Sequence, residues 1–263
     1  MKAALSRNLS VAFISLVATS LLIGSWELLA LSGQLLKVFP APSQVYEFAV
    51  EEMENFFSRS EGSFGAGIHL YHSIKRVLIG FFIACVVGIP IGIILGFSGV
   101  LGRAFYPHVH ILRQVSPLAW LPIGLALTRN SEYAAIFVIA ICSVWPIMLS
   151  VASSIAFIPK AYYEVAGVFG IRGFRFIRRV LMPSILPQVI ASMRVGFGIS
   201  WMVIVAAEML VGNRGIGYFI WNEWNNLNLS GVIFAILLIG AVGILVDSLF
   251  VQLEQAFNYN KRR

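Results

Sequence analysis

The sequence predicts an all-α integral membrane protein with about six transmembrane helices. Hydrophobic residues make up 59% of the 263 residues and charged residues only 12%, which is about half the charged fraction of a typical soluble domain. The apolar residues also gather in long segments, each near the roughly 20 residues that a helix needs to cross the hydrocarbon core. The predicted spans are Val11–Leu31, Ile74–Phe97, Phe105–Leu127, Tyr133–Phe157, Ile185–Val211 and Val232–Val251.

The net charge of +7 comes from Lys and Arg residues that lie mainly in short loops and at the termini. Positive charge in these places sets membrane topology, so no nucleic-acid partner is expected. More of it falls on one side of the membrane when both termini are placed in the cytoplasm, as the positive-inside rule requires. Lys75 and Arg76, at the outer mouth of the second span, are the exception and are expected to snorkel into lipid headgroups.

Residues 32–73 form the longest segment predicted to lie outside the membrane. Pro40 and Pro42 favour an extended entry, and Ser43 is expected to cap a short amphipathic helix. The apolar face of this helix would carry Tyr46, Val50, Met53 and Phe57. No tandem repeat divides the chain, so we predict one transmembrane domain over residues 1–263, with its core at about 70–252.

Three glycines in the second span, Gly88, Gly92 and Gly96, recur at four-residue intervals. Glycines at this spacing share one face of a helix and allow another helix to approach its backbone closely. Helix packing explains the pattern fully, so we expect a structural role and no direct role in transport.

The third span contains two prolines, Pro117 and Pro122, that interrupt its helical hydrogen bonding. Irregular backbone at membrane depth is tolerated only where protein or a watery cavity satisfies it. Arg113, Gln114 and Ser116 precede the break, and Trp120 lies inside it. Interrupted helices mark substrate pathways in other transporters, but a simple kink has the same sequence. These residues are therefore candidates for a translocation path, and both interpretations stay open.

Two further ionisable residues, Arg194 and Glu208, lie within the fifth span, where a charge costs about 2.5–3.5 kcal/mol at the helix centre. Arg194 either faces an anion's path or snorkels to the inner surface and pairs with lipid phosphate. A carboxylate in an anion's route would repel it by about 4 kcal/mol at about 4 Å and an effective dielectric constant of 20. Glu208 is therefore expected to be a hydrogen-bonded gate residue or to form a salt bridge with Arg214.

Residues 157–184 form a basic segment that is expected to be a cytoplasmic loop containing a short helix. Pro159 is placed to start that helix, and Glu164 in its first turns would suit the helix dipole. The aromatic and apolar residues Tyr162, Tyr163, Val165 and Phe169 would give it a surface for a partner's groove. A loop that only carries topogenic charges is the alternative.

The spacing of Glu164, Ala166, Gly170 and Pro183 resembles the coupling loop of permease subunits of ATP-binding-cassette (ABC) importers. In that family the loop docks onto a separate ATPase, so the resemblance assigns these four residues to ATPase coupling. Position 180 is valine and position 182 is methionine, where the family more often has isoleucine and leucine. Both replacements are apolar and conservative.

Other stretches are similar to permeases of the nitrate/bicarbonate/sulfonate type, above all to the nitrate branch. These stretches are residues 116–122, 206–210 and 223–227. The resemblance implies a type I ABC importer permease fold in a bacterial inner (plasma) membrane. It also implies a second permease copy in a homodimer or heterodimer, cytoplasmic ABC ATPase subunits that carry ATP and Mg, and an extracytoplasmic solute-binding protein. Nitrate is the expected substrate, with bicarbonate, cyanate and sulfonate or taurine as alternatives.

The sequence predicts no catalytic, cofactor or metal site in this chain. It has no Gly-x-x-x-x-Gly-Lys-Ser/Thr loop for ATP, and its histidines do not have metal-ligand spacing. Cys85 and Cys142 lie in apolar segments, where cysteines usually pack as small core residues. An ion-gradient-driven secondary carrier remains the alternative from another class, but it leaves the pattern from Glu164 to Pro183 unexplained.

Overall fold

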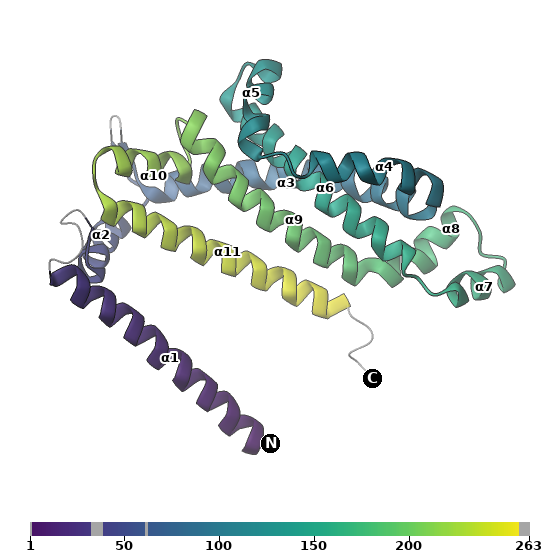
Figure 1. Cartoon of the computed structure of the whole chain (residues 1–263), viewed down its shortest axis with the longest axis horizontal. Coiled ribbons are helices and arrows are strands. Elements are labelled where there is room, and N and C mark those ends of the chain that lie inside the picture. Colours follow the sequence, from purple (N-terminus) through teal and green to yellow (C-terminus); the bar gives the residue numbers. More distant parts are fainter. Residues whose placement is uncertain (1, 33–38, 61–62, 258–263) are drawn as a thin grey trace. The chain divides into compact units, whose positions relative to one another are not determined.

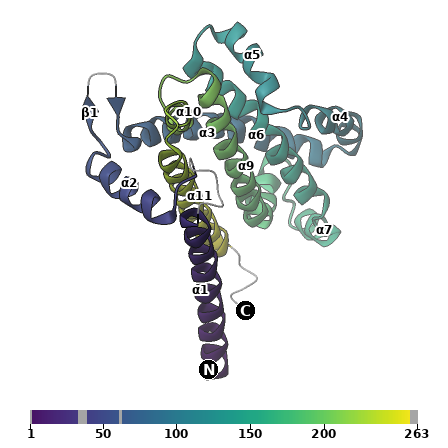
Figure 2. The ribbon, with the colours of Figure 1, turned by 60° about the vertical axis from the view of Figure 1, so that its left-hand side comes forward.

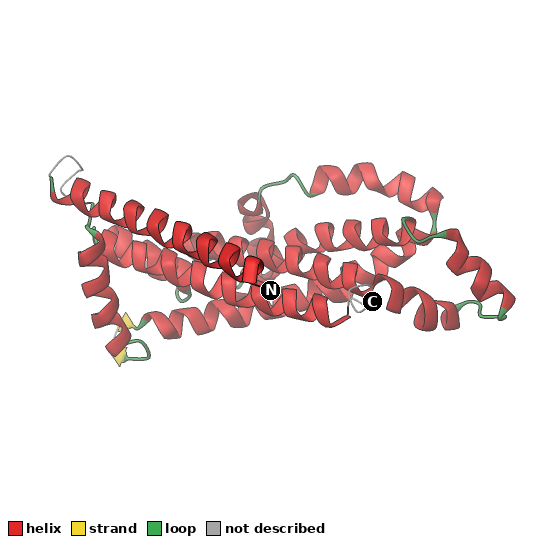
Figure 3. Cartoon of the chain, turned by 90° about the horizontal axis from the view of Figure 1, so that it is seen from below, coloured by secondary structure: helices red, strands yellow, loops and turns green. Residues whose placement is uncertain are grey.

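The computed structural model describes residues 2–32, 39–60 and 63–257, and nearly all of them are helical (Figure 1). The helices are α1 (Lys2–Leu31), α2 (Pro42–Glu54), α3 (Ala66–Phe97), α4 (Gly99–Leu112), α5 (Pro117–Thr128), α6 (Ser131–Ala156), α7 (Lys160–Val168), α8 (Phe174–Phe176), the π-helix η1 (Ile177–Leu181), α9 (Met182–Val211), α10 (Ile216–Asn225) and α11 (Leu229–Phe257). Within the described ranges, β1 (Arg59–Ser60) and β2 (Ser63–Phe64) are the only strands, and they pair as a two-residue hairpin (Figure 3). The all-α prediction is confirmed.

Five of the described helices are long and apolar enough to cross a membrane, and there are six spans if one bent pair is counted as a span. The bent pair is α4 and α5, whose axes differ by 94° across the residues before Pro117 (Figure 1). The prediction of about six spans is therefore confirmed, with five continuous helices and one bent pair. The third of them is broken where the two prolines indicated a break.

The chain forms two compact units. The first comprises Met1–Ile68 and Phe219–Leu238, and the second comprises His69–Tyr218 and Ile239–Arg263. All the candidate path and coupling residues fall in the second unit. The predicted single permease domain stays a prediction.

In the first unit, α2 follows α1 in the chain. The helix begins at Pro42, one residue earlier than the predicted cap at Ser43, and the Gln44 side chain accepts a hydrogen bond from Ala41 N–H at 3.0 Å. The Ser43 hydroxyl instead donates to Glu27 Oε1 at 2.8 Å, which gives Glu27 a structural role. The predicted apolar face of α2 is exposed at Tyr46, Val50, Met53 and Phe57.

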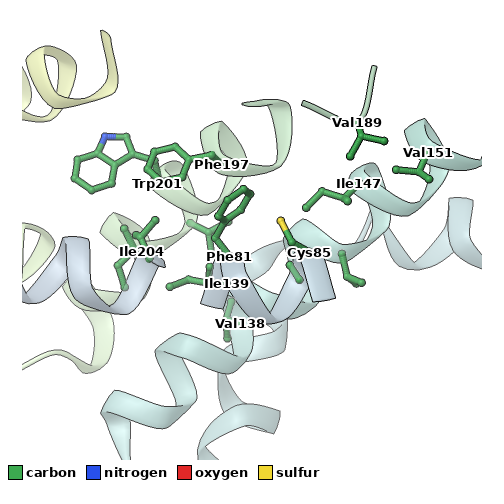
Figure 4. Packing of buried hydrophobic residues seen from close by; sticks show 14 of the residues in the cluster. Phe81, Cys85, Val138, Ile139, Ile147, Val151, Val189, Phe197, Trp201 and Ile204 are labelled. Atoms are coloured by element: carbon green, nitrogen blue, oxygen red, sulfur yellow. The ribbon is translucent and has the colours of Figure 1, made fainter. Parts of the chain in front are cut away.

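The core of the second unit is built around α6, which packs against α5 and α9 (Figure 2). Ile139 and Ile147 on α6 are fully buried, and Figure 4 shows them beside aromatic side chains of α3 and α9. The rings of Phe81 and Phe197 meet edge to face with centroids 5.5 Å apart. Such pairs stabilise by about 0.5–1.5 kcal/mol beyond the burial of their area.

The glycine face of α3 lies directly on the backbone of α6, as its spacing predicts. A Cβ atom added to Gly92 would lie 2.7 Å from the carbonyl oxygen of Met148. One at Gly96 would lie 2.9 Å from the carbonyl oxygen of Ala152, and one at Gly88 would lie 3.1 Å from that of Val144. Gly80, two steps earlier, lies against the Ile139 side chain, to which an added Cβ atom would come within 2.7 Å. The stripe therefore sets the distance between α3 and α6.

We expect Gly92→Ala to lower the free energy of unfolding by about 1–3 kcal/mol, because the new methyl group overpacks the α3–α6 contact. The matched control is Gly240→Ala in α11, where an added Cβ meets nothing within 4 Å and the change should be neutral or slightly stabilising. Thermal midpoints in detergent would check both variants. Equal shifts would contradict the role given to the stripe.

Candidate functional site

The predicted short helix is α7, which begins after Pro159 as expected. Its end is fixed at Gly170, whose φ of +65° lies in the left-handed region. Gly170 N–H donates to Gly167 O at 3.1 Å and Ile171 N–H donates to Ala166 O at 2.8 Å. This hydrogen-bond pair is the Schellman motif, which satisfies the last carbonyls of a helix and favours glycine at that position. A residue that tolerates the left-handed conformation is therefore needed at position 170 to end α7 sharply.

The two faces of α7 differ in burial. Ala166 is 4% exposed, and the ring of Tyr163 stacks on Phe176 with centroids 5.1 Å apart. The opposite side exposes Val168 at 87% and Phe169 at 75%. Such a patch of uncovered apolar side chains is typical of a protein-docking surface.

Two details of the predicted coupling segment are corrected. Glu164 lies in the second turn of α7, where the helix dipole has little effect, since that effect falls off within the first turn. The basic residues Arg175, Arg178 and Arg179 lie on helical turns of α8 and η1, not in a loop. Pro183 lies in the first turn of α9. It has no N–H to continue an α-helical ladder, and just before it the segment is π-helical, with Met182 N–H bonded to Ile177 O.

A cavity of about 370 Å³ opens at the break between α4 and α5. Arg113, Gln114 and Trp120 line it together, as three of the predicted path residues. Ser116 instead caps α5, because its Oγ accepts a hydrogen bond from Leu118 N–H at 3.3 Å. The break is thus associated with a cavity and is more than a kink.

Arg113 also lines a second cavity of about 560 Å³, which reaches the end of α6 before the coupling segment. That cavity is lined by Tyr106, His110, Arg113, Pro146, Leu149, Ser150, Ser153, Ala156 and Phe157. Arg113 and Pro146 are common to both cavities. Arg113 therefore lies between the cavity at the helix break and the cavity at the end of α6.

Trp145 on α6 is a wall residue of the first cavity that the sequence analysis did not select. Its indole nitrogen is buried and has no hydrogen-bond partner among the described residues. A buried indole N–H usually finds an acceptor. The sequence carried no signal for this residue, since a tryptophan in an apolar segment is normally a packing residue.

Arg194 forms an ion pair with Asp247 of α11, through Nε to Oδ1 and through Nη2 to Oδ2 at 2.7 Å. Both side chains are partly exposed, at 39% and 49%. The predicted snorkelling or lipid pairing of Arg194 is replaced by this bidentate contact, and the first cavity is lined by its α9 neighbours Val195 and Ile199. Arg194 is therefore not placed with Arg113.

Glu208 is 1% exposed and sits in a closed polar cluster. Its Oε1 accepts a hydrogen bond from Arg76 Nη1 at 2.7 Å, and its Oε2 accepts one from Ser73 Oγ at 2.7 Å. Both partners come from α3, more than 130 residues earlier in the chain. Glu208 therefore forms its ion pair with Arg76. The predicted salt bridge with Arg214 is wrong. Arg76 is 5% exposed, so its predicted snorkelling into headgroups is also wrong.

The cluster also fixes the turn that follows α9. Arg76 Nη1 donates to Arg214 O at 2.7 Å, and Gly217 N–H donates to Glu208 Oε2 at 3.2 Å. Ile216 N–H donates to Ser73 Oγ at 2.8 Å. Any side chain at Gly215, whose φ is +123°, would collide with the Glu208 carboxylate. We call Ser73, Arg76, Glu208 and the turn from Gly212 to Gly217 the carboxylate clamp.

In the first unit, the polar run after α10 acts mainly as a helix cap. Asn228 Oδ1 accepts a hydrogen bond from Gly231 N–H at 3.3 Å, and Asn228 Nδ2 donates to Glu223 Oε2 at 2.5 Å. Burial raises the pKa of the Glu223 carboxyl, the hydrogen bond from Asn228 partly opposes this rise, and the charge of Glu52 adds to it. Asn228 therefore caps the start of α11.

Residues 88–259 match a protein family described as "Binding-protein-dependent transport system inner membrane component". The chain is 38% identical over 239 residues to the nitrate import permease protein NrtB of Synechocystis sp., covering 90% of this chain and 86% of that protein. It is 39% identical over 184 residues to the bicarbonate transport system permease protein CmpB of Synechococcus elongatus, covering 70% and 66%.

Among solved structures, the chain is similar to one of the MetNI methionine ABC transporter in inward-facing conformations. The TM-score is 0.65 at 18% sequence identity, and the similarity covers 72% of this chain and 94% of that chain. At this identity the likeness concerns the fold alone, and it confirms the predicted type I importer permease fold.

Proposed function

The chain belongs to the family of binding-protein-dependent transport system inner membrane components, and from that premise we propose that it is the permease of an ATP-driven nitrate importer. The choice of nitrate as substrate is supported by the similarity to a nitrate import permease along most of both chains. Bicarbonate is the second candidate, because bicarbonate permeases are 39% identical over 184 residues and 36% identical over 225 residues.

The proposed importer contains two permeases, cytoplasmic ABC ATPase subunits and an extracytoplasmic solute-binding protein. ATP and Mg bind to the ATPases, and this chain contributes no catalytic residue. With both termini in the cytoplasm, α7 faces the ATPases. Two observations support this docking role of α7: the exposed apolar side chains of Val168 and Phe169, and the sharp end of the helix at Gly170. Glu164, Ala166 and Pro183 complete the proposed coupling segment.

The proposed path of the anion passes Arg113, which lines both cavities. A fixed cation lowers the cost of dehydrating an anion inside a membrane protein. Gln114 and Trp120 belong to the same cavity. Arg194 and Glu208 are assigned structural roles instead, because each is already paired with an opposite charge.

The test is uptake of ¹⁵N-nitrate by cells that lack other nitrate transporters and express this chain with its ATPase and solute-binding protein. We expect uptake to stop when the P-loop lysine of the ATPase subunit is replaced. Uptake should persist when the ion gradient across the membrane is collapsed at constant ATP concentration. Excess bicarbonate should not compete. Uptake that follows the gradient would establish a secondary carrier, and competition by bicarbonate would establish the second candidate.

A further inference from the structure

We infer that the cavity at the α4–α5 break is a selectivity filter for singly charged, weakly hydrated oxyanions, with Arg113 and the Trp145 indole as its anion-binding groups. This inference rests on the proposed function. It adds that the permease itself selects its substrate, independently of the choice made by the solute-binding protein.

The first argument is charge. Among the described residues that line this cavity, Arg113 is the only one with a formal charge, and none of them is a carboxylate. One guanidinium group neutralises one negative charge and offers paired N–H donors to two oxygens of a planar oxyanion. A doubly charged anion would keep one charge that this single cation does not neutralise. The cavity therefore favours monovalent anions.

The second argument is the supply of hydrogen-bond donors. Gln114 adds an amide group to the lining, and the Trp145 N–H has no acceptor among the residues that the structure describes. An oxyanion held by Arg113 would supply the missing acceptor. Less than 1 Å² of the indole nitrogen is accessible, so the ring has to turn towards the cavity when the anion binds.

The third argument is the apolar remainder of the wall. Leu112, Val115, Val195 and Ile199 cannot replace the water molecules that an anion loses on entry. Anions with tightly held water, such as sulfate, are therefore disfavoured relative to nitrate. Bicarbonate also carries a hydroxyl group that needs a hydrogen-bond acceptor. Among the described lining residues, only Gln114 has a side-chain oxygen, so the cavity suits bicarbonate less well than nitrate.

The cavity contains its own chemical reporter. Cys142 lines it, whereas the other cysteine, Cys85, is buried in the core at 7% exposure. A small uncharged thiol reagent should therefore modify Cys142 faster than Cys85. The rate of labelling measures access to the cavity without requiring transport.

The experiment labels the intact importer in lipid nanodiscs with N-ethylmaleimide, in a Cys85→Ala background, at constant ionic strength. We expect nitrate to slow the labelling of Cys142 at least threefold, and sulfate or bicarbonate to leave it unchanged. Arg113→Gln should abolish the protection, and Trp145→Phe should weaken it at unchanged labelling without anion. Arg113→Lys keeps the charge but loses the paired donors, and it should protect only partly.

Protection that survives in Arg113→Gln, or that sulfate and bicarbonate give equally, would overturn the filter. The outcome is separable from the proposed function. If cells take up nitrate while nitrate leaves Cys142 labelling unchanged, the filter fails and the proposed function stands. If bicarbonate is the anion that is imported and the one that protects in an Arg113-dependent way, the nitrate proposal fails and a different selectivity must be assigned to the cavity.

Discussion

Gly170→Asp should leave the protein folded and inserted but reduce nitrate uptake by about tenfold or more, with ATP hydrolysis no longer tied to transport. An added Cβ at Gly170 meets nothing within 4 Å, and Asp tolerates the left-handed conformation better than most residues. The variant therefore places a negative charge at the end of α7, beside the exposed Phe169, without disturbing the packing. A tenfold loss corresponds to about 1.4 kcal/mol of docking free energy.

Two controls separate docking from strain. Gly173→Asp also places an Asp at a positive φ with open space around it, but it lies beyond α7, and its ψ of −135° is outside the left-handed helical region, so it is the more strained of the two variants. Gly170→Asn adds the same volume and tolerates the same φ without the charge. We expect both to keep most of the uptake. The measurements are uptake in cells and ATPase activity of the purified complex with and without its solute-binding protein.

Equal losses in Gly170→Asp and Gly173→Asp would show that strain or charge anywhere in this segment is harmful, and the assignment of α7 to coupling would be withdrawn. A Gly170→Asp protein that does not reach the membrane would count against the structural argument, since nothing described near Gly170 obstructs the new side chain.

Arg76→Ala should be the most destabilising single change in the second unit, with an expected loss of about 3–5 kcal/mol. It leaves the Glu208 carboxylate buried at 1% exposure without its cationic partner. It also removes the donor to Arg214 O, so the turn after α9 loses one of its anchors. Thermal unfolding followed by size-exclusion chromatography would measure the loss.

The neighbouring residue supplies a matched control. Lys75 is also a cation on α3, but its pair with Glu132 is long, at 3.8 Å, and half exposed. Exposed pairs contribute only about 0–1 kcal/mol, so Lys75→Ala should change the midpoint little. Similar effects of the two changes would mean that the carboxylate clamp does not hold the turn.

The fold and the short helix α7 could be predicted from sequence because their signals are local. Apolar length defines a span, Pro117 and Pro122 define a break, and Gly88 to Gly96 define a packing face within one helix. The end of α7 at Gly170 belongs to the same class, since a left-handed residue after a helix is a local requirement. Each of these features depends on residues within a few turns of one another.

The pairings could not be predicted, because they join residues distant in sequence. The choice of Arg76 over Arg214 as the partner of Glu208 depends on where α3 lies against α9. The contact between Arg194 and Asp247 depends in the same way on α11. Trp145 was missed because the feature that marks it is a buried indole N–H without an acceptor among the described residues. A sequence does not show which buried groups lack a hydrogen-bond partner.

The carboxylate clamp also has a consequence for biosynthesis. Arg76 and Glu208 are 132 positions apart, so at about 5–20 residues per second the ribosome needs about 7–26 s to supply the second after the first. Throughout that interval the second span carries a guanidinium group without its final partner. Nascent chains that stall before Glu208 should therefore hold α3 poorly in the bilayer and should be preferred substrates for membrane proteolysis. The order of synthesis therefore delays the completion of the carboxylate clamp until α9 and the turn after it have been made.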